Sequence, residues 1–137
     1  MNRFKNAFIA HLKKEGIKFV DRDEKIVSIS YRGDNMPSID IIVAFDADEK
    51  PDVSLRCWTI AKFPEDKMLN GLVASNELNK QYRFVRFCVD KDNDLNCEAD
   101  IDLTENSCGE LILKLVRRMV NIVDDAYPVA MKALWGN

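Results

Sequence analysis

The sequence predicts an α+β domain in which helices cover one face of an antiparallel sheet. Apolar residues recur at helical spacing near both ends of the chain. Alternating runs of strand type fill the region 26–60, and two more precede the last helical stretch. The 137 residues suit one domain. We therefore expect a single two-layer domain over residues 1–137, built as helix, three strands, helix, two strands and helix.

The first helix is predicted over about residues 3–15. Asn2 is a suitable N-cap, and Phe4, Phe8 and Leu12 follow at intervals of four residues, which places them on one face. Gly16 is a typical residue just after a helix end.

Three strands and a second helix are expected next. Turn residues at 33–37 and 46–51 separate the strands, and Pro64 with the acids after it starts a helix that ends near Asn79. The apolar faces of the strands are Val27, Ile29 and Tyr31; then Ile39, Ile41, Val43 and Phe45; then Val53, Leu55, Cys57 and Thr59. For the helix, the predicted buried side is Met68, Leu69, Leu72, Val73 and Leu78.

A hairpin is predicted from Phe84–Val89 and Leu95–Leu103. Placing Val89 opposite Leu95 makes one face almost wholly apolar and pairs Arg86 with Glu98 on the other. Slipping by one residue would set apolar side chains against acids, so we reject the slipped register. The connecting run 90–94 resembles the start of a calcium loop, but its sixth and twelfth positions lack the glycine and the carboxylate that such a loop needs. We therefore expect a turn.

The last helix is predicted to begin at a capping box formed by Ser107 and Glu110. Pro128 should kink or split it near Asp124, and Gly136 should end it. Its apolar residues at helical spacing are Leu111, Leu115, Met119, Ile122, Val123 and Ala126, continued by Ala130, Met131, Leu134 and Trp135.

This order of elements resembles the YbjN-like family of bacterial sensory-transduction regulators and the related type III secretion chaperone fold. The resemblance extends from Phe4 to Trp135 and is carried by the run 39–43, the hairpin strand 82–87 and the capped final helix. It implies a regulator or a chaperone-like protein, with dimers that bind extended peptide as one possibility. No site residue can be transferred from the family.

Composition argues against several classes of protein. Twenty basic and 23 acidic side chains leave a net charge of −3, which is untypical of nucleic-acid binders. Charged residues interrupt the N-terminal segment, and no apolar run approaches the ~18 residues of a membrane span. We expect a cytoplasmic protein that binds neither nucleic acid nor membrane.

No catalytic, cofactor or metal site is expected. The four cysteines are scattered without a close pair, and the chain has one histidine, so we interpret the cysteines as small buried hydrophobes. His11 lacks an evident nucleophile and should be a surface or half-buried residue at the edge of the apolar helix face. The neighbouring carboxylates of Asp124 and Asp125 point apart on a helix. The five glycines are isolated, so none forms a phosphate loop.

The outer face of the sheet is the remaining candidate surface. If the helices cover the face of Val27 and Ile41, alternation sends a second set of apolar residues outward, where they would form a patch larger than a monomer normally exposes. Alternatively, the last helix or the segment around Met36 folds over this face, or Trp58 faces the helices. The predicted partner-binding residues are Ile42, Arg56, Trp58, Ile60, Phe84 and Arg86, with Ile26 and Ala44 beside them.

These observations favour a non-enzymatic binding module, regulatory or chaperone-like, that forms a homodimer and captures an extended peptide or a protein client. The alternative is a regulatory domain that senses a small ligand in a cleft between the last helix and the sheet.

Overall fold

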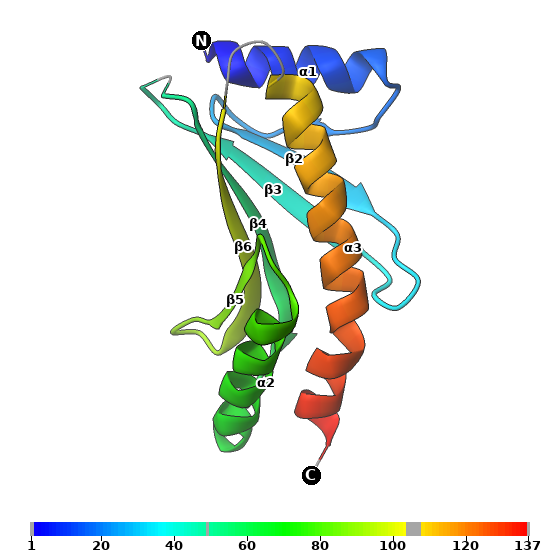
Figure 1. Cartoon of the computed structure of the whole chain (residues 1–137), viewed down its shortest axis with the longest axis vertical. Coiled ribbons are helices and arrows are strands. Elements are labelled where there is room, and N and C mark those ends of the chain that lie inside the picture. Colours follow the sequence, from blue (N-terminus) through cyan, green and yellow to red (C-terminus); the bar gives the residue numbers. More distant parts are fainter. Residues whose placement is uncertain (1, 49, 104–107, 137) are drawn as a thin grey trace.

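The computed structural model describes residues 2–48, 50–103 and 108–136. Within this part of the chain, strands form one antiparallel sheet in the order β1-β2-β3-β4-β6-β5, accompanied by three α-helices (Figure 1). The predicted order of elements is confirmed, with a short first strand and a 3-10 turn in addition. The elements are α1 (Arg3–Lys14), β1 (Val20–Asp21), β2 (Ile26–Tyr31), β3 (Ile39–Phe45), β4 (Asp52–Lys62), the 3-10 turn η1 (Glu65–Lys67), α2 (Met68–Gln81), β5 (Arg86–Val89), β6 (Asp94–Asp102) and α3 (Cys108–Trp135).

The helices cover one face of the sheet. Figure 1 shows α3 running along that face, with α1 crossing its beginning and α2 lying beside its end. Gly109 allows α1 to approach closely, because a Cβ at this position would lie 3.0 Å from the carbonyl oxygen of Ala7. The core between the layers includes Phe8, Leu12, Val27, Ile41, Val43, Leu55, Ile112, Val116, Met119 and Val123, all fully buried.

The predicted caps of α1 are confirmed. The side-chain oxygen of Asn2 accepts hydrogen bonds from the backbone N–H groups of Phe4 and Lys5, at 2.9 and 3.1 Å. Gly16 has a φ of 68°, and the N–H of Ile17 donates to the carbonyl of Leu12 at 2.9 Å. This left-handed residue and six-to-one bond end a helix without leaving its last carbonyls unpaired.

The predicted hairpin register is confirmed, since Arg86 pairs with Glu98 and Val89 with Leu95. β5 begins at Arg86 rather than Phe84, because Phe84 has a φ of 79° and cannot continue a strand. The outer edge of β5 meets the side chain of Asn79 in α2. Its Nδ2 donates to the carbonyl of Phe87 at 2.9 Å, and its Oδ1 accepts from the N–H of Phe87 at 2.6 Å.

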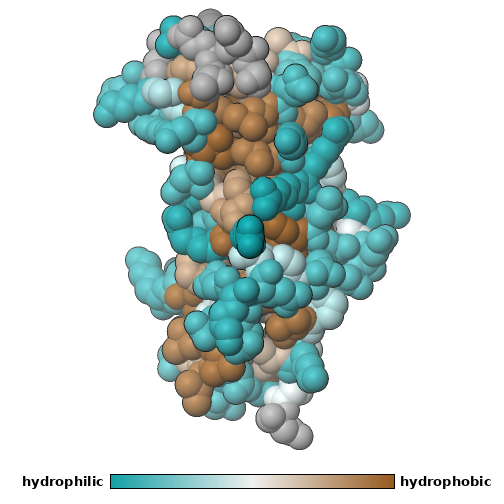
Figure 2. All heavy atoms as spheres, in the orientation of Figure 1, coloured by the Kyte–Doolittle hydropathy of each residue, from teal (hydrophilic) through white to brown (hydrophobic). Residues whose placement is uncertain are grey.

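The predicted buried side of α2 is partly wrong. Leu69, Leu72 and Val73 are 72%, 50% and 55% exposed, and Figure 2 shows apolar surface in the region of the molecule that α2 occupies. α2 instead packs through small residues, which let the helix come close to its neighbours. A Cβ on Gly71 would lie 2.9 Å from the ring of Phe63. The buried residues of α2 are Gly71, Ala74, Ser75 and Leu78.

α3 continues as one helix through Pro128, so the expected split does not occur. A proline removes the N–H that would reach the carbonyl four residues earlier. Here the side-chain Nδ2 of Asn35 donates to that carbonyl, on Asp124, at 3.1 Å. Ser107, the predicted capping residue, lies outside the described residues. Among the helices of the described ranges, none combines the length and apolar character needed to cross a bilayer.

The adjacent carboxylates of α3 hold two separate segments. Asp124 accepts hydrogen bonds from the backbone N–H groups of residues 34–36, at 3.1, 2.8 and 2.9 Å. These bonds lower the pKa of Asp124, with the bond from Met36 contributing most. Asp125 accepts from the hydroxyl of Tyr82, the residue after α2. Because neighbouring side chains on a helix point about 100° apart, each acid anchors a different part of the chain to α3.

Candidate functional site

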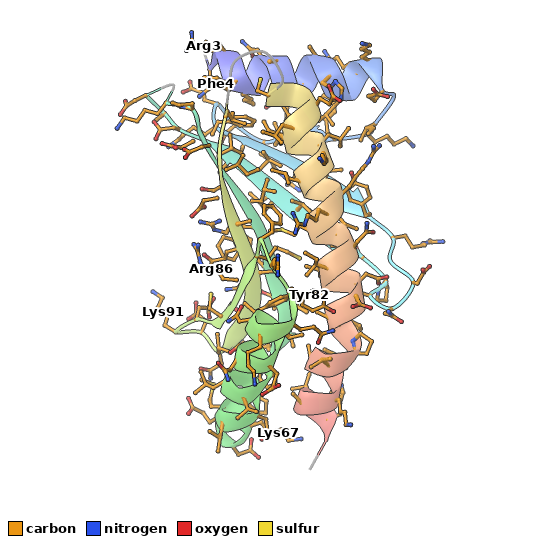
Figure 3. The ribbon with its side chains drawn as sticks, in the orientation of Figure 1. Arg3, Phe4, Lys67, Tyr82, Arg86 and Lys91 are labelled. Carbon is orange, nitrogen blue, oxygen red and sulfur yellow. The ribbon has the colours of Figure 1, made fainter. Side chains whose placement is uncertain are left out.

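The outer face of the sheet carries Ile42, Arg56, Trp58 and Arg86, as predicted. Ile42 and Arg56 are half-buried, Arg86 is exposed, and Trp58 is 51% exposed. In Figure 3, Arg86 lies on the side of the sheet away from α3. The described part of the chain places neither predicted cover on this face: α3 lies on the other side, and the N–H of Met36 donates to Asp124 of α3.

Ile60 and Phe84 do not belong to this surface, which corrects their predicted placement. Ile60 is 4% exposed and belongs to the hydrophobic core. Phe84 lies before β5 and packs beneath α3, with the guanidinium carbon of Arg118 5.0 Å from its ring centroid. Strict alternation fails at both positions, because β4 contains a bulge and Phe84 has a left-handed backbone conformation.

A bulge in β4 positions Trp58. The strand pairs Cys57 with Cys97 but next pairs Ala61 with Leu95, so β4 has two more residues than β6 between these pairs. Thr59, at the centre of the bulge, has a φ of 54°, which a β-branched residue adopts only when its surroundings hold it. An irregular strand with an exposed aromatic side chain is a common way to present a residue to a partner.

Asn96 of β6 holds the bulge. Its side chain is on the outer face of the sheet, yet the residue is only 2% exposed. Its Oδ1 accepts from the backbone N–H of Thr59 at 2.8 Å, and its Nδ2 donates to the carboxylate of Asp90 at 2.8 Å. Both ends of this buried amide are therefore paired, and one of them fixes the backbone next to Trp58.

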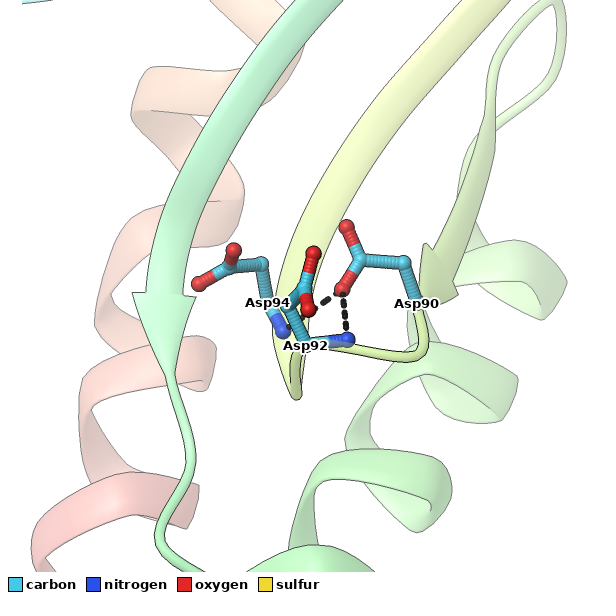
Figure 4. Close-up of side chains that lie close together, drawn as sticks. All are labelled: Asp90, Asp92 and Asp94. Atoms are coloured by element: carbon cyan, nitrogen blue, oxygen red, sulfur yellow. Dashed lines mark hydrogen bonds between the residues drawn. The ribbon is translucent and has the colours of Figure 1, made fainter.

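The acidic run 90–94 forms the predicted turn. One oxygen of Asp90 accepts from the backbone N–H groups of Asp92 and Asp94, at 2.9 and 3.1 Å (Figure 4). The pKa of Asp90 is lowered, first by the hydrogen bond from Asn96 and then by the turn's own N–H groups. The carboxylates of Asp90, Asp92 and Asp94 each offer an oxygen within 4.8 Å of the others. Asp90 uses both of its oxygens to hold the turn and Asn96.

On the outer face, Arg56 and Arg86 form an ion-pair network with acids of the same chain. Arg56 lies 3.5 Å from Glu98 and 3.0 Å from Asp100, and Arg86 lies 2.8 Å from Glu98. Burial opposes the ionisation of Glu98, but hydrogen bonds from Cys88 and Arg86 and the charge of Arg56 lower its pKa. Each guanidinium is therefore already paired with carboxylates of the same chain.

The outer face carries further acids at the end of β4 and β6 that is far from Trp58. On β4 and β6, Asp52 lies directly opposite Asp102. A hydrogen bond with Asp102, together with burial and its like charge, raises the pKa of Asp52. The half-buried apolar residues Ile42 and Ala44 lie on the same face. The surface thus combines the exposed indole of Trp58 with the half-buried side chains of Ile42 and Ala44 and with carboxylates. Its apolar area is smaller than predicted.

A shallow groove of about 1050 Å³ lies along α3, between α1 and Tyr82. Helical side chains and Tyr82 line it, so it differs from the cleft between helix and sheet that the sequence suggested. His11 is half-buried as predicted and lies 3.9 Å from Glu15. The basic residues of the groove besides His11 are Lys14, Lys114, Arg117 and Arg118, and its acids are Glu15, Glu110 and Asp125.

The cysteines match their interpretation as buried hydrophobes, except Cys88. Cys57 and Cys97 lie opposite each other on β4 and β6 and are at most 1% exposed, and we call them the core cysteines. Burial raises the pKa of Cys57 to about 12 and raises that of Cys97 as well. Cys88 is half-buried, and burial with a hydrogen bond to Glu98 raises its pKa to about 11.

Sequence reasoning missed Asn96 and the exposed side of α2. An asparagine at an outward position of an alternating strand looks like an ordinary surface residue, and nothing in the pattern shows that its amide is buried. For α2, the sequence does contain a sign of the buried side, namely the small residues Gly71, Ala74 and Ser75. Small residues on one side of a helix indicate that this side packs closely against its neighbours.

Comparisons with known proteins agree with this architecture. A model of the YbjN family, described as "Putative bacterial sensory transduction regulator", matches residues 9–130. The crystal structure of YbjN from E. coli is similar with a TM-score of 0.66 and 12% identity, over 90% of this chain and 87% of that one. A chain in the crystal structure of the ExsC-ExsE complex is similar with a TM-score of 0.57 and 14% identity, over 100% of this chain and 100% of that one. No curated protein sequence matches.

At these identities the structural likenesses establish the fold, and the family match extends over most of the chain. The resemblance that the order of elements suggested is confirmed: this chain belongs to the YbjN family.

Proposed function

We propose that this protein is a non-enzymatic, regulatory or chaperone-like binding module that captures a protein or an extended peptide through the outer face of its sheet. The observation that carries the proposal is Trp58, which is 51% exposed on a bulge that Thr59 and Asn96 hold in place. The YbjN description and the similarity to the ExsC-ExsE complex support a regulatory or chaperone-like role that involves a protein partner. We place this activity in the cytoplasm and expect the protein to act as a homodimer.

The charges of the surface favour a basic client. On β4, β5 and β6, the carboxylates of Asp52, Glu98, Asp100 and Asp102 outnumber the guanidinium groups of Arg56 and Arg86. An apolar side chain of the client would pack on the indole, while lysine or arginine residues further along the same extended segment would meet Asp52 and Asp102, six residues along β4 from Trp58. Because opposite charges steer association, binding should weaken as salt rises.

The test compares the two tryptophans. Trp58→Asp should abolish capture of client proteins from a lysate of the native host, whereas Trp135→Asp should not, although Trp135 is 75% exposed. Captured proteins are identified by mass spectrometry, and each is then titrated against the Trp135→Phe protein, in which Trp58 is the only tryptophan. A client that quenches or shifts this fluorescence at saturating amounts confirms the surface. Equal capture by wild type and Trp58→Asp would contradict it.

A second candidate function is the sensing of a small anionic ligand in the groove along α3. The observation that favours it is the set of cations, which includes Lys114 and Arg117. A metabolite panel should then contain an anion that raises the melting temperature of the wild type, by mass action, and not that of Arg117→Glu. A panel in which no anion raises it would argue against this function.

A further inference from the structure

The second half of β6 has a side that β5 does not cover. β6 extends over Asp94–Asp102, but its pairing with β5 ends at Glu98. The residues before β5 do not continue the ladder, because Phe84 has a φ of 79° and leaves the strand conformation. On the side of β5, the residues Ala99–Asp102 therefore lie beside no strand of the described chain, and we call them the open edge of β6.

A backbone hydrogen bond at the end of β6 shows which groups point to the open edge. The N–H of Leu103 donates to the carbonyl of Pro51, on the β4 side, at 2.7 Å. Because backbone groups alternate in direction along an antiparallel strand, those of Asp100 and Asp102 point the opposite way, toward the open edge. β5 does not reach these groups, and no loop hydrogen bond within the described residues ends on them.

The outermost strand gives the same direction independently. Asn79 of α2 binds both the N–H and the carbonyl of Phe87 from outside the sheet. Cys97, opposite Phe87, must therefore direct its own backbone groups toward β4. Counting from Cys97 in steps of one, Asp100 and Asp102 again face outward. Each presents an N–H and a carbonyl that an added strand could bond.

An apolar surface lies beside the open edge on the helix side of the sheet. Leu111 and Leu115 of α3 are half-buried and share one side of the helix with Arg118. The guanidinium of Arg118 lies over the ring of Phe84, which precedes β5, so this side of α3 faces the space beyond the beginning of β5. Figure 2 shows apolar surface beside the first half of α3, toward β6.

The other side of the open edge is acidic. The side chains of Asp100 and Asp102 are exposed on the outer face, while the residues between and beside them are buried. Asp52 lies directly opposite Asp102 on β4. Asp100 already pairs with Arg56 at 3.0 Å, so Asp102 is the acid on which a cation at the edge would act most.

We propose that the open edge of β6 binds an extended peptide segment in which apolar and basic residues alternate, as an added strand that continues the line of β5. The backbone of the segment pairs with Asp100 and Asp102. Its apolar side chains contact Leu111 and Leu115, and its basic side chains meet Asp102. The inference rests on the proposed capture of a basic client, and it assigns the continuation of that client to the edge.

The charges disfavour a second copy of this chain as the occupant. Pairing two open edges would set the carboxylates of Asp100 and Asp102 in one copy beside those in the other, and like charges on facing strands are destabilising. The open edge is also short, about 13 Å at the rise of a strand. A contact this small is below the usual size of a specific interface, so we expect a dissociation constant of about 100 μM for an isolated peptide.

The experiment titrates the full chain with a six-residue peptide of alternating valine and lysine, blocked at both ends, and follows the backbone amides by NMR. The amide protons of Asp100 and Asp102 should shift, and at saturation they should exchange with solvent at least about tenfold more slowly. The control peptide carries N-methyl groups on its lysines, whose N–H groups would face β6, and it should cause no shift. This control leaves the protein unaltered, so folding is not at risk.

Two substitutions at Asp102 separate the charge from the backbone. Asp102→Asn removes only the carboxylate and should raise the dissociation constant about threefold. Asp102→Pro also removes the outward N–H and should raise it at least about tenfold, and proline is tolerated where the N–H points away from the neighbouring strand. Asp92→Asn, at an exposed acid in the turn before β6, is the matched control and should leave binding unchanged.

Trp58→Asp should leave binding of this peptide unchanged, which separates the edge from the outer face. Capture of a client that depends on Trp58, without any binding of the peptide, would refute the edge and leave the proposed function intact. Equal binding of the plain and N-methylated peptides, or of the wild type and Asp102→Pro, would overturn the inference. So would a wild-type dimer that Asp102→Pro dissociates, because a second copy would then occupy the edge.

Discussion

Replacing Asn96 by alanine should destabilise the fold and release the bulge that presents Trp58. The amide of Asn96 is 2% exposed and pairs with the N–H of Thr59 and the carboxylate of Asp90. Losing a hydrogen bond of this kind costs about 1 kcal/mol, and the cavity left by the amide adds a comparable amount. We therefore expect a loss of about 2 kcal/mol in the free energy of unfolding. For a chain of this size that lowers the melting temperature by roughly 5–8 °C.

The assay combines urea unfolding with fluorescence in a Trp135→Phe background, where tryptophan emission reports on Trp58 alone. Asn96→Ala should lower the unfolding midpoint and shift the emission of the native protein, because the backbone beside the indole loses its anchor. Asn96→Asp keeps the acceptor for Thr59 but sets a carboxylate against Asp90. At pH 7 it should therefore unfold at a lower temperature than Asn96→Ala.

Asn121→Ala, at an exposed position of α3, is the matched control and should change the free energy by less than about 0.5 kcal/mol. The reasoning is refuted if Asn96→Ala is as stable as this control, or if the emission of Trp58 in the native protein is the same with and without Asn96.

The remaining predictions concern α3, α2 and the thiols. Asp124→Ala should accelerate amide exchange in residues 34–36 roughly tenfold. Folding lowers the pKa of Asp124, so the stability that this carboxylate contributes is complete at pH values above its ordinary pKa of 3.8. This contribution is lost as the pH falls through the lower pKa of the folded state. The melting temperatures of Asp124→Ala and the wild type should therefore converge in acid. Gly71→Ala should cost about 1–2 kcal/mol in thermal unfolding, since overlap with Phe63 outweighs the gain in helix propensity; a stabilised variant would contradict this. Iodoacetamide at pH 8 should modify Cys88 slowly and the core cysteines only after unfolding, as read by peptide mass mapping; equal rates in the folded protein would be the contrary result.

The sequence pattern predicted those features that depend on local periodicity. The register of β5 and β6 followed from keeping like faces together, and the ends of α1 followed from Asn2 and Gly16, whose geometry is local. Trp58 was placed correctly because it directly follows Cys57, before the bulge alters the alternation. Local rules suffice wherever the backbone is regular.

The errors have long-range causes. Ile60 lies within a bulge that depends on Asn96, a residue far along the chain. The exposure of Leu69 and Leu72 depends on how closely α2 approaches Phe63, which hydrophobic spacing alone does not determine. The helix through Pro128 stays whole because Asn35, from a distant loop, replaces the lost N–H. In each case a contact between distant residues overrides the local pattern.

The amide of Asn79 has a consequence for how this sheet can grow. By occupying both the N–H and the carbonyl of Phe87, it imitates a further strand and terminates the ladder at β5. An extended chain, whether from a client or from an unfolded neighbour, finds no free hydrogen-bonding position at this residue. The side chain of Asn79 therefore opposes edge-to-edge pairing of sheets through β5. A variant such as Asn79→Val would expose this edge and favour aggregation.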